Sequence, residues 1–559
     1  MNNCILVIGG TGVFGKRLCK HLITQFTGVK LVITARSEKK AQSQAADFQQ
    51  LAFGDNVVVG RSLNLPTDSL QTLLSQVGPA IVVDCSGPFQ LANHSTPEIV
   101  LRVGAHYLDL ADARDYLSAF SAQLNSTAVN FQKLAVAGCS STPTLSMCVL
   151  RSLIEDWQRI DTIDIAVTPG GKSDVGESVV AAILSYVGSP ISCFEQGELG
   201  VTTGWGNSHR IAVAGLGKRL VSPVETLDAE LLSSEFDIKN HMSFSAGLES
   251  KLEHRSLQLL SWLRKFNVIP SPQVLAPLLL KARKVSRITT SDTGGMTIIV
   301  TGLDEHGVRA RSEWSLLAKH DDGPYVPVLP AAAVIRKMLS TKLSPRAMLG
   351  GEILNLHDIE NEMSAYAITT QTNKTAAQTS IFKRSLGDQT FSKVLLALQL
   401  FHGDYASSVW TGKGTVRTGS WLTKVIAKAF GFPATGDNIP IAVTVDHKLD
   451  NKGRWQERWT RTFAGRSFNS LLKFTSDDHL TETFPPLTFN LGVTADEKQL
   501  TMPVAGWRIA SIPLPKFLAP VSEASEYQDA QGRFCFDVKL SHPLLGLIAH
   551  YQGWLEDKG

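Results

Sequence analysis

The sequence predicts three domains: a doubly wound parallel α/β domain over residues 1–150, an α+β domain with an antiparallel sheet over 151–365, and a mainly antiparallel β domain with a few helices over 366–559. Three observations support this. The first third alternates short apolar runs with helical patterns, which is typical of parallel sheets. From Thr162 onward, strand patterns follow one another across short turns, which favours antiparallel pairing. A length of 559 residues suits several domains of about 100–200 residues each.

The composition is that of an ordinary globular protein, with 43% hydrophobic and 19% charged residues. A net charge of +3 is too small at this length to indicate a nucleic-acid partner. The sequence has no His-Glu-x-x-His motif, no cysteine cluster and no Gly-x-Ser-x-Gly motif, so we expect neither a metal site nor a serine nucleophile of that type. We therefore expect the partner to be a small-molecule substrate and not a nucleic acid.

Cysteine usage and hydropathy predict the location. The seven cysteines are scattered without a Cys-x-x-Cys pair, which favours free thiols in a reducing compartment. Apolar stretches such as Val274–Leu280 are short and interrupted by proline, so we expect no integral membrane segment. The chain begins with a strand pattern rather than a signal-type segment, and we therefore expect a cytoplasmic protein.

The first element is a buried strand that ends in a glycine-rich turn. Ile5–Ile8 is apolar, Gly10-x-Gly12-x-x-Gly15 follows, and apolar residues then recur at helical spacing. One glycine permits the turn, one lets the backbone approach a pyrophosphate, and one lets the helix pack closely on the strand. The anion then lies on unpaired N–H groups at the helix N-terminus. This order predicts a Rossmann-type dinucleotide site formed by Gly10, Thr11, Gly12, Val13, Phe14 and Gly15.

The second strand, Lys30–Thr34, predicts which dinucleotide binds. A site for NAD has an acidic residue about 20 residues after the glycines, where it binds the ribose 2′-hydroxyl. Here Arg36 occupies that place, with Ser37 beside it and two lysines after it. A guanidinium suits a 2′-phosphate, so we predict NADP (NADPH) as the cofactor, with NAD less favoured. The alternative is that these residues are only the solvated start of a helix.

The pattern then repeats: a helix over 41–51, a strand at 57–59, a helix over 69–76, and a strand over 80–84. The loop Ser86, Gly87, Pro88 and Phe89 follows at the carboxyl end of a strand, where it either contacts the cofactor or is a plain turn. A strand at 134–137 is expected to close the sheet. The next residues, Ser140, Ser141 and Thr142, either cap the helix that leads away or face the nicotinamide.

Three segments carry a family resemblance: Gly9-Gly-Thr-Gly-Val-Phe-Gly15, Ser86-Gly-Pro-Phe89 and Gly104-Ala-His-Tyr-Leu-Asp-Leu110. Together they resemble the NADP-binding domain of saccharopine dehydrogenase-like oxidoreductases. The resemblance implies that the first segment holds the pyrophosphate, the second lies on the nicotinamide side, and the third is a strand behind it. Relatives often continue the third segment with Gly-Glu, where this chain has Ala111-Asp112-Ala113. Asn64 lies where an adenine contact is often found.

The second domain resembles the α+β domain of the same family, which implies substrate binding and contacts of a homodimer. The pattern predicts a strand at 162–167, a helix over 177–187, a helix over 248–266, and a hairpin from 285–290 and 295–302 followed by a strand at 309–317. Basic residues in it can bind an anionic substrate or remain solvated surface: His209, Arg210, Lys218 and Arg219. A boundary is expected near 365, with Thr369–Ser380 as a linker.

The C-terminal third begins with expected helices over 392–400 and 421–430, the second ending at Gly431-Phe-Pro433. Expected strands follow at 440–446, 454–463, 467–474, 533–540 and 547–555. Its motifs resemble a domain of unknown function, DUF4166, that often follows saccharopine dehydrogenase-like domains. On the strand 454–463, one face carries Trp455, Glu457, Trp459, Arg461 and Phe463. A Glu–Arg pair between aromatic rings is either a buried polar element or the wall of a ligand cavity.

These observations predict an NADP-dependent oxidoreductase that transfers a hydride to or from an imine or carbonyl of a small, amino-acid-derived substrate. No residue is assigned as the proton donor, since Tyr107 and His209 are only guesses. Two alternatives stay open: a catalytically silent NADP-binding scaffold or sensor, and a reductase of a lipid-like metabolite held by the C-terminal domain.

Overall fold

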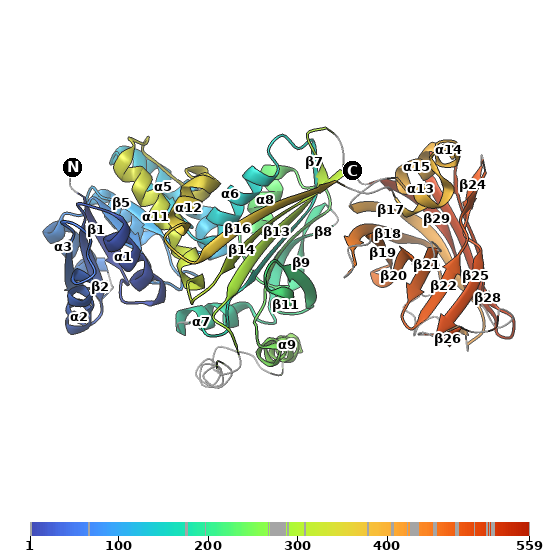
Figure 1. Ribbon diagram of the computed structural model, residues 1–559, viewed down its shortest axis with the longest axis horizontal. Coiled ribbons are helices and arrows are strands. Elements are labelled where there is room, and N and C mark those ends of the chain that lie inside the picture. Colours follow the sequence, from blue (N-terminus) through green and yellow to red (C-terminus); the bar gives the residue numbers. More distant parts are fainter. Residues whose placement is uncertain are drawn as a thin grey trace.

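The computed structural model arranges the chain as three parts in a row, with the N-terminal domain at one end and the C-terminal β domain at the other (Figure 1). The structure describes residues 3–557 apart from 65–66, 174–176, 196, 267, 269–286, 288–289, 307–308, 377–379, 404–406, 422, 425–434, 451–454, 476–479, 497, 510–511, 514 and 516–519. The strands that it describes form three sheets.

The first sheet is a seven-stranded parallel sheet in the order β3-β2-β1-β4-β5-β6-β15. Its strands are apolar because both faces are covered by helices. They are β1 (Cys4–Ile8), β2 (Lys30–Ala35), β3 (Val57–Ser62), β4 (Ile81–Asp84), β5 (His106–Asp109), β6 (Leu134–Ala137) and β15 (Arg346–Leu349). The order reverses between β1 and β4, and open α/β sheets bind their ligands at such a switch point.

Helices cover the two faces of this sheet (Figure 1). They are α1 (Val13–Gln25), α2 (Glu38–Gln49), α3 (Thr67–Val77), α4 (Ser95–Arg102), α5 (Arg114–Asn130), α6 (Ser146–Leu153), α11 (Leu329–Ser340) and α12 (Leu356–Met363), with single helical turns at Ser141–Leu145, Gly323–Val328 and Gly350–Glu352. Buried side chains of α1, such as Leu18 and Leu22, pack against apolar residues of the strands. The predicted doubly wound α/β domain is therefore confirmed.

The expectation that the strand at 134–137 closes the sheet is wrong. Strand β15 pairs in parallel with β6 and forms the edge, with Arg346 beside Leu134 and Leu349 beside Ala137. The chain thus returns to the first sheet after strand β14 of the second, with α11 packed against α1, and only then adds β16 to the second sheet. A four-residue strand that pairs across some 200 residues leaves no periodic signal in the sequence.

The second sheet has the order β10-β11-β12-β7-β13-β14-β16, with β8 and β9 joined to it through β12. Its strands are β7 (Arg159–Thr168), β8 (Pro190–Glu195), β9 (Glu198–Thr203), β10 (His209–Val213), β11 (Gly217–Pro223), β12 (His241–Ala246), β13 (Gly294–Leu303), β14 (Arg309–Ala318) and β16 (Ile368–Ala376). The helices are α7 (Glu177–Tyr186), α8 (Asp228–Phe236) and α9 (Lys251–Lys265). One face of this sheet packs on α6, so the first two parts share a core.

Two expectations about this part need correction. The hairpin consists of β13 and β14, whereas most of the expected strand 285–290 lies outside the described residues. Most of the expected linker Thr369–Ser380 is the edge strand β16, which pairs with β14 from Ile368 to Ala376. Threonine, which is frequent in this stretch, suits an exposed edge strand as well as a linker, so composition alone did not separate the two.

The third sheet is antiparallel, with 13 strands in the order β23-β24-β27-β28-β29-β17-β18-β19-β20-β21-β22-β25-β26, and it curls around a hydrophobic core (Figure 1). The strands are β17 (Ser407–Thr418), β18 (Gly436–Leu449), β19 (Trp455–Phe463), β20 (Arg466–Phe474), β21 (Leu480–Phe484), β22 (Leu487–Leu491), β23 (Thr494–Ala495), β24 (Gln499–Thr501), β25 (Val504–Ile509), β26 (Ile512–Pro513), β27 (Val521–Gln528), β28 (Phe534–His542) and β29 (Gly546–Asp557). This confirms the predicted fold class of the domain.

Three short helices pack at one end of this sheet: α13 (Ile381–Leu386), α14 (Asp388–Phe391) and α15 (Leu396–Phe401). The helix expected over 392–400 begins only at Leu396, as α15, and the residues before it form the turn that follows α14. Most of the helix expected over 421–430, and its stop signal at 431–433, lie outside the described residues.

Three whole-chain features bear on function. In the described part of the chain, no helix is long and apolar enough to cross a membrane, and the stretch Val274–Leu280 lies outside that part. All seven cysteines are free thiols. No group of three or more His, Cys, Asp and Glu side chains that could hold a metal occurs among the residues with described positions.

Candidate dinucleotide site

The glycine turn connects β1 to α1 at the carboxyl edge of the first sheet. Gly9 adopts a left-handed conformation with φ +70°, which glycine reaches without steric cost. The N–H of Gly12 donates to the carbonyl of Gly9 at 2.9 Å and closes the turn. Gly12 is the N-cap residue of α1 and has no side chain that could cap the helix. The first turn of α1 thus presents backbone N–H groups at the positive end of the helix dipole.

Close packing explains why the other two glycines are needed. A Cβ atom on Gly15 would lie 2.3 Å from the carbonyl oxygen of Gly9, and one on Gly10 would lie 2.6 Å from Cγ2 of Ile33. The helix and turn therefore touch through backbone atoms, as the spacing predicted. Thr11, Val13 and Phe14 are half-buried, and Phe14 packs against the core.

The loop after β4 lies against the glycine turn. A Cβ on Gly9 would lie 3.0 Å from Cα of Ser86, which places the loops after β1 and β4 side by side at the switch point. The carboxylate of Asp84 fixes this loop by accepting bonds from the backbone N–H and the hydroxyl of Ser86, at 2.8 and 2.6 Å. Ser86 and Pro88 are exposed and Gly87 is half-buried. Phe89 instead turns inward, with its ring 5.3 Å from that of Tyr116, so its side chain anchors the loop.

A buried carboxylate behind the site holds the next two loops together. Asp109, at the end of β5, accepts from the N–H groups of Gly138 at 2.8 Å and Ala111 at 3.1 Å, and from the hydroxyl of Tyr116 at 2.9 Å. Burial raises the pKa of Asp109 to about 7, although the backbone bonds and Tyr116 oppose the shift. Tyr107 is fully buried and its hydroxyl lies 3.3 Å from that of Tyr116. This strand therefore positions loops, as the resemblance implied, and it keeps Tyr107 away from solvent.

Arg36 and Ser37 follow β2 at the same edge. Arg36 is exposed, and Ser37 caps α2 by accepting from the N–H of Lys40 at 3.4 Å. The nearest acidic residue in sequence, Glu38, accepts bonds from the N–H of Ser62 at 3.0 Å and from Gln42 at 2.9 Å. Bonds from Ser62 lower the pKa of Glu38. Its carboxylate is therefore already bonded to residues of β3 and α2, whereas Arg36 is exposed at this strand end.

The structure contradicts one of the two roles expected for the Ser/Thr cluster after β6, which is the capping of the helix by Ser140. Ser140 makes no side-chain cap, and Thr142 and Ser146 instead donate to the carboxylate of Asp228 in α8. Burial raises the pKa of Asp228, and these hydroxyl bonds oppose the shift. The cluster therefore ties the nucleotide domain to the second domain. Asp228 could not be predicted from the sequence, because its contact with Thr142 spans more than 80 residues.

Gln90 and Asp112, a pair that was not predicted from the sequence, lie at the carboxyl edge of the first sheet. Gln90 Nε2 donates to Oδ1 of Asp112 at 3.3 Å, so the loops after β4 and β5 meet there. Burial raises the pKa of the Tyr186 phenol on α7, and the Asp112 carboxylate raises it further. His209, the other guessed proton donor, is exposed at the start of β10.

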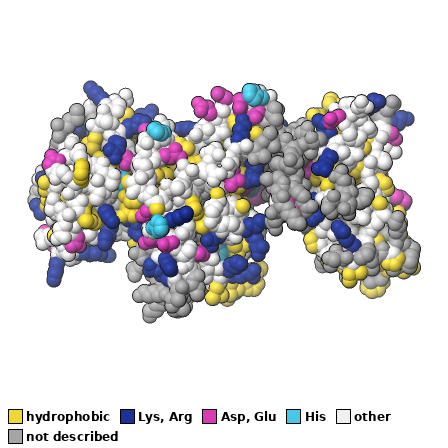
Figure 2. Space-filling model, viewed as in Figure 1, with side chains coloured by type: hydrophobic (Ala, Val, Ile, Leu, Met, Phe, Trp, Pro, Cys, Tyr) yellow, Lys and Arg dark blue, Asp and Glu magenta, His cyan; other side chains and the backbone are white. Residues whose placement is uncertain are grey.

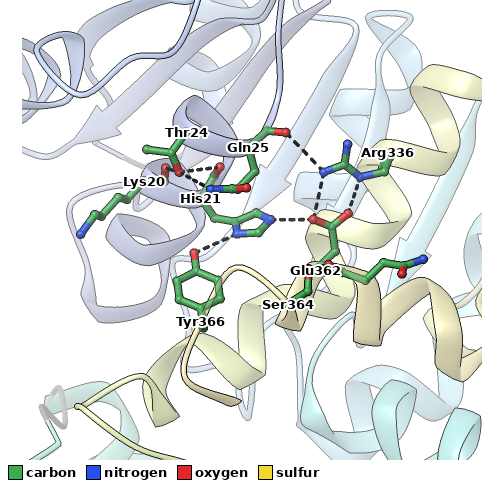
Figure 3. Close-up of polar contacts among 9 residues, drawn as sticks. Lys20, His21, Thr24, Gln25, Arg336, Glu362, Ser364 and Tyr366 are labelled. Carbon is green, nitrogen blue, oxygen red and sulfur yellow. Dashed lines mark hydrogen bonds and ion pairs between the residues drawn. The ribbon is translucent and has the colours of Figure 1, made fainter. Parts of the chain in front are cut away.

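A polar cluster beneath α1 fixes that helix (Figure 3). His21 is fully buried, with Nε2 2.7 Å from Glu362 Oε2 and Nδ1 2.8 Å from the hydroxyl of Tyr366. Arg336 on α11 donates to both carboxylate oxygens of Glu362 and stacks 4.1 Å from the ring centre of Phe26. The helix of the glycine turn is thus bonded to the segment that returns after the second domain.

Two solved structures similar to this chain are dehydrogenases. A saccharopine dehydrogenase (L-Glu forming) from Saccharomyces cerevisiae is 11% identical and covers 67% of this chain and 100% of its own, with a TM-score of 0.48. An amine dehydrogenase from Mycobacterium smegmatis is 11% identical and covers 64% and 97%, with a TM-score of 0.33.

No curated relative matches the sequence. A family model matches the C-terminal domain only: residues 367–555 match the one described as "Domain of unknown function (DUF4166)", which confirms the resemblance predicted for that domain.

Proposed function

We propose that the chain is an NADP-dependent oxidoreductase that reduces an imine or carbonyl of a small substrate. The observation that carries this is the carboxyl edge of the first sheet, where an uncapped helix N-terminus, two contacting loops and an exposed arginine lie in the order that a dinucleotide requires. Gly10 and Gly15, where a Cβ atom would collide with Ile33 and with the carbonyl of Gly9, let the turn and α1 pack closely on the strands. Gly12 is exposed at the N-cap, so no side chain separates the first turn of α1 from a pyrophosphate.

In this proposal each residue binds the part of the cofactor or substrate that lies nearest to it. The backbone N–H groups of Gly12, Val13 and Phe14 bind the pyrophosphate, and Arg36 binds the 2′-phosphate of the adenosine ribose. The cofactor, when bound, supplies the hydride. Ser86 and Gly87 lie on the side where the nicotinamide would rest. We take Asp112, which is bonded to Gln90 at that edge, and Tyr186, whose pKa the Asp112 charge raises, as the candidates for holding the substrate or a proton.

NADP is proposed over NAD because of the contrast between Arg36 and Glu38. An NAD site needs a carboxylate free to accept from the ribose hydroxyls, and the carboxylate of Glu38 already accepts from Ser62 and Gln42. The guanidinium of Arg36 is exposed and offers paired donors to a phosphate.

The test is the affinity of Arg36→Ala for NADPH and NADH, measured by the fluorescence of the reduced nicotinamide. We expect NADPH binding to weaken about 10–100-fold, the value of a lost charge-assisted bond, and NADH binding to stay unchanged. Lys30→Ala is the control, since it removes an exposed cation at the opposite end of the same strand. Equal affinities of Arg36→Ala and the unaltered chain for NADPH would show that the 2′-phosphate does not bind there.

Turnover separates an enzyme from a silent scaffold. Amino-acid-derived imines, ketones and enoyl compounds are offered with NADPH, and the absorbance of the reduced nicotinamide is followed. Consumption with any of them supports the oxidoreductase. Tight NADPH binding without consumption by any of them supports the scaffold or sensor.

A further inference from the structure

The curled sheet of the C-terminal domain encloses a cavity of about 250 Å³. This volume is near the lower end of the range for small-molecule pockets, about 300–1,000 Å³. Alternate residues of β28 line it, from Phe534 through Leu540, as do Trp459, Arg461 and Phe463 of β19. The face of β19 that the sequence offered either as a polar element or as a cavity wall is therefore the cavity wall.

The charged residues that line the cavity are paired within the protein. Arg461 donates to Glu482 at 3.1 Å and to the hydroxyl of Ser470 at 2.7 Å, and its guanidinium lies 4.8 Å from the ring centre of Trp459. Glu526 lies 2.5 Å from Nε2 of the buried His402. Glu457, which the sequence suggested as the partner of Arg461, is not among the residues that line the cavity, and it accepts from Trp459 Nε1 at 3.0 Å. Each of the two carboxylates that line the cavity, Glu482 and Glu526, is therefore already bonded to a partner within the protein.

The ion pair between Arg461 and Glu482 favours an uncharged ligand over a charged one. A carboxylate ligand would have to displace Glu482 from Arg461 and leave that acid buried without its cation, which is strongly unfavourable. An ammonium ligand would compete in the same way for Glu482. A guanidinium has five N–H donors, and the bonds to Ser470 and Glu482 use two of them. An uncharged oxygen can accept from the others without breaking the pair.

The cavity is closed at one end and open at the other. Residues beside the short helices, such as Phe401 and Phe534, are buried, whereas Trp507 and Leu545 at the other end are half-exposed. Exposed apolar side chains continue from that end: Ile509, Ile512 and Leu544. Figure 2 shows hydrophobic side chains gathered at the end of the domain where Figure 1 places β26. An apolar rim favours entry of an apolar molecule.

We propose that this cavity binds an uncharged, mostly aliphatic molecule whose single hydroxyl or carbonyl oxygen accepts a hydrogen bond from Arg461. The aliphatic part lies along Phe463, Phe534 and Phe536. This binding does not depend on the proposed cofactor, and it is measured on the full chain without nucleotide.

The probe is Nile red, an uncharged dye that fluoresces in apolar surroundings, displaced by three ligands of equal chain length. We expect decan-1-ol to displace it, and decanoate and decylammonium at pH 7 to be weaker by about tenfold or more, since their charges would disturb the Arg461–Glu482 pair. Failure of decan-1-ol to displace the dye, or stronger displacement by either charged ligand, would overturn the proposal.

Two variants locate the binding. Ala524→Trp fills the cavity and is expected to abolish dye binding, whereas Ser525→Trp puts the same ring on the opposite face of β27 and should leave it intact. Equal dye binding by both variants would place the dye elsewhere and refute the site. The double variant Arg461→Met/Glu482→Met keeps the wall neutral and should bind the dye normally but decan-1-ol about tenfold more weakly. Unchanged decan-1-ol affinity would refute the role of Arg461. Circular dichroism checks that each variant is folded.

Discussion

At the scale of single residues, buried carboxylates order the candidate site. Asp84, Asp109 and Asp228 each accept bonds from loop residues at the carboxyl edge, and none of them is exposed. Their role is to fix the loops that would contact a dinucleotide. Each carries a burial cost that raises its pKa, so these residues also link the site to pH.

Replacing Asp109 tests this link. The folded chain holds the Asp109 proton with a pKa of about 7, against about 3.9 when unfolded, so the folded state binds more protons between these values. The free energy of unfolding therefore falls as pH rises from about 4 to about 7. Asp109→Asn keeps acceptors for Gly138 and Ala111 but does not titrate, so its stability should gain on that of the unaltered chain across this range and level off above it.

Urea unfolding followed by circular dichroism at intervals from pH 4 to pH 8 measures the difference. Asp115→Asn is the control, because that carboxylate is on the same side of the domain and its side chain is 90% exposed. Its curve should run parallel to that of the unaltered chain. Parallel curves for Asp109→Asn as well would mean that Asp109 does not retain its proton.

At the scale of elements, local sequence patterns predicted the elements that are encoded within a short stretch of chain, but not the strands that pair with distant segments. The glycine turn, β1 and β2 were predicted because an apolar run, three spaced glycines and a helical period lie within 35 residues. Strand β15 and edge strand β16 were missed, because their pairing partners are far away and their residues show no strict alternation. In the site, Arg36 was predicted from its position, but the engagement of Glu38 by Ser62 and the bond from Thr142 to Asp228 depend on tertiary contacts.

The anchoring of α1 gives the prediction at this scale. Glu362 has an exposed fraction of 3% and bonds to both His21 and Arg336, so Glu362→Gln leaves the Arg336 charge without its partner. Because the Arg336 side chain is 48% exposed and water screens part of its charge, we expect the free energy of unfolding to fall by about 2 kcal/mol at pH 7. Burial raises the pKa of Glu362, but the bonds from His21 and Arg336 outweigh it, and the pKa lies below its ordinary value.

The sign of the pH dependence follows from that lowered pKa. A carboxyl group with a depressed folded pKa contributes stability that is complete above its unfolded pKa of about 4.3 and is lost as pH falls through the folded value. The difference between the two chains should hold from pH 7 to about pH 5 and shrink below about pH 4. Thermal unfolding at each pH measures it. Glu98→Gln, in the exposed i,i+4 pair with Arg102, should cost no more than about 0.5 kcal/mol; an equally small cost for Glu362→Gln would contradict the anchoring role.

At the scale of the whole molecule, the cores show where the chain divides. Among the residues that the structure places, the core of the C-terminal domain is built from Ile381 onward, whereas the core shared by the first two parts ends at Ile368. Strand β16 lies between them and pairs with β14 from Ile368 to Ala376. By hydrogen bonding it belongs to the second sheet, although the DUF4166 match begins at residue 367.

Two truncations test whether β16 belongs to the second sheet or to the C-terminal domain. A chain of residues 1–376 keeps β16 and should stay folded and monodisperse, because no core cluster is cut. A chain of residues 1–366 removes β16 and leaves the long strand β14 as an unprotected edge, which pairs readily with other chains. We therefore expect it to form large species in size-exclusion chromatography and to unfold at lower temperature in circular dichroism. If residues 1–366 were as stable and as monodisperse as 1–376, β16 would be dispensable to the second sheet and the boundary would lie before it.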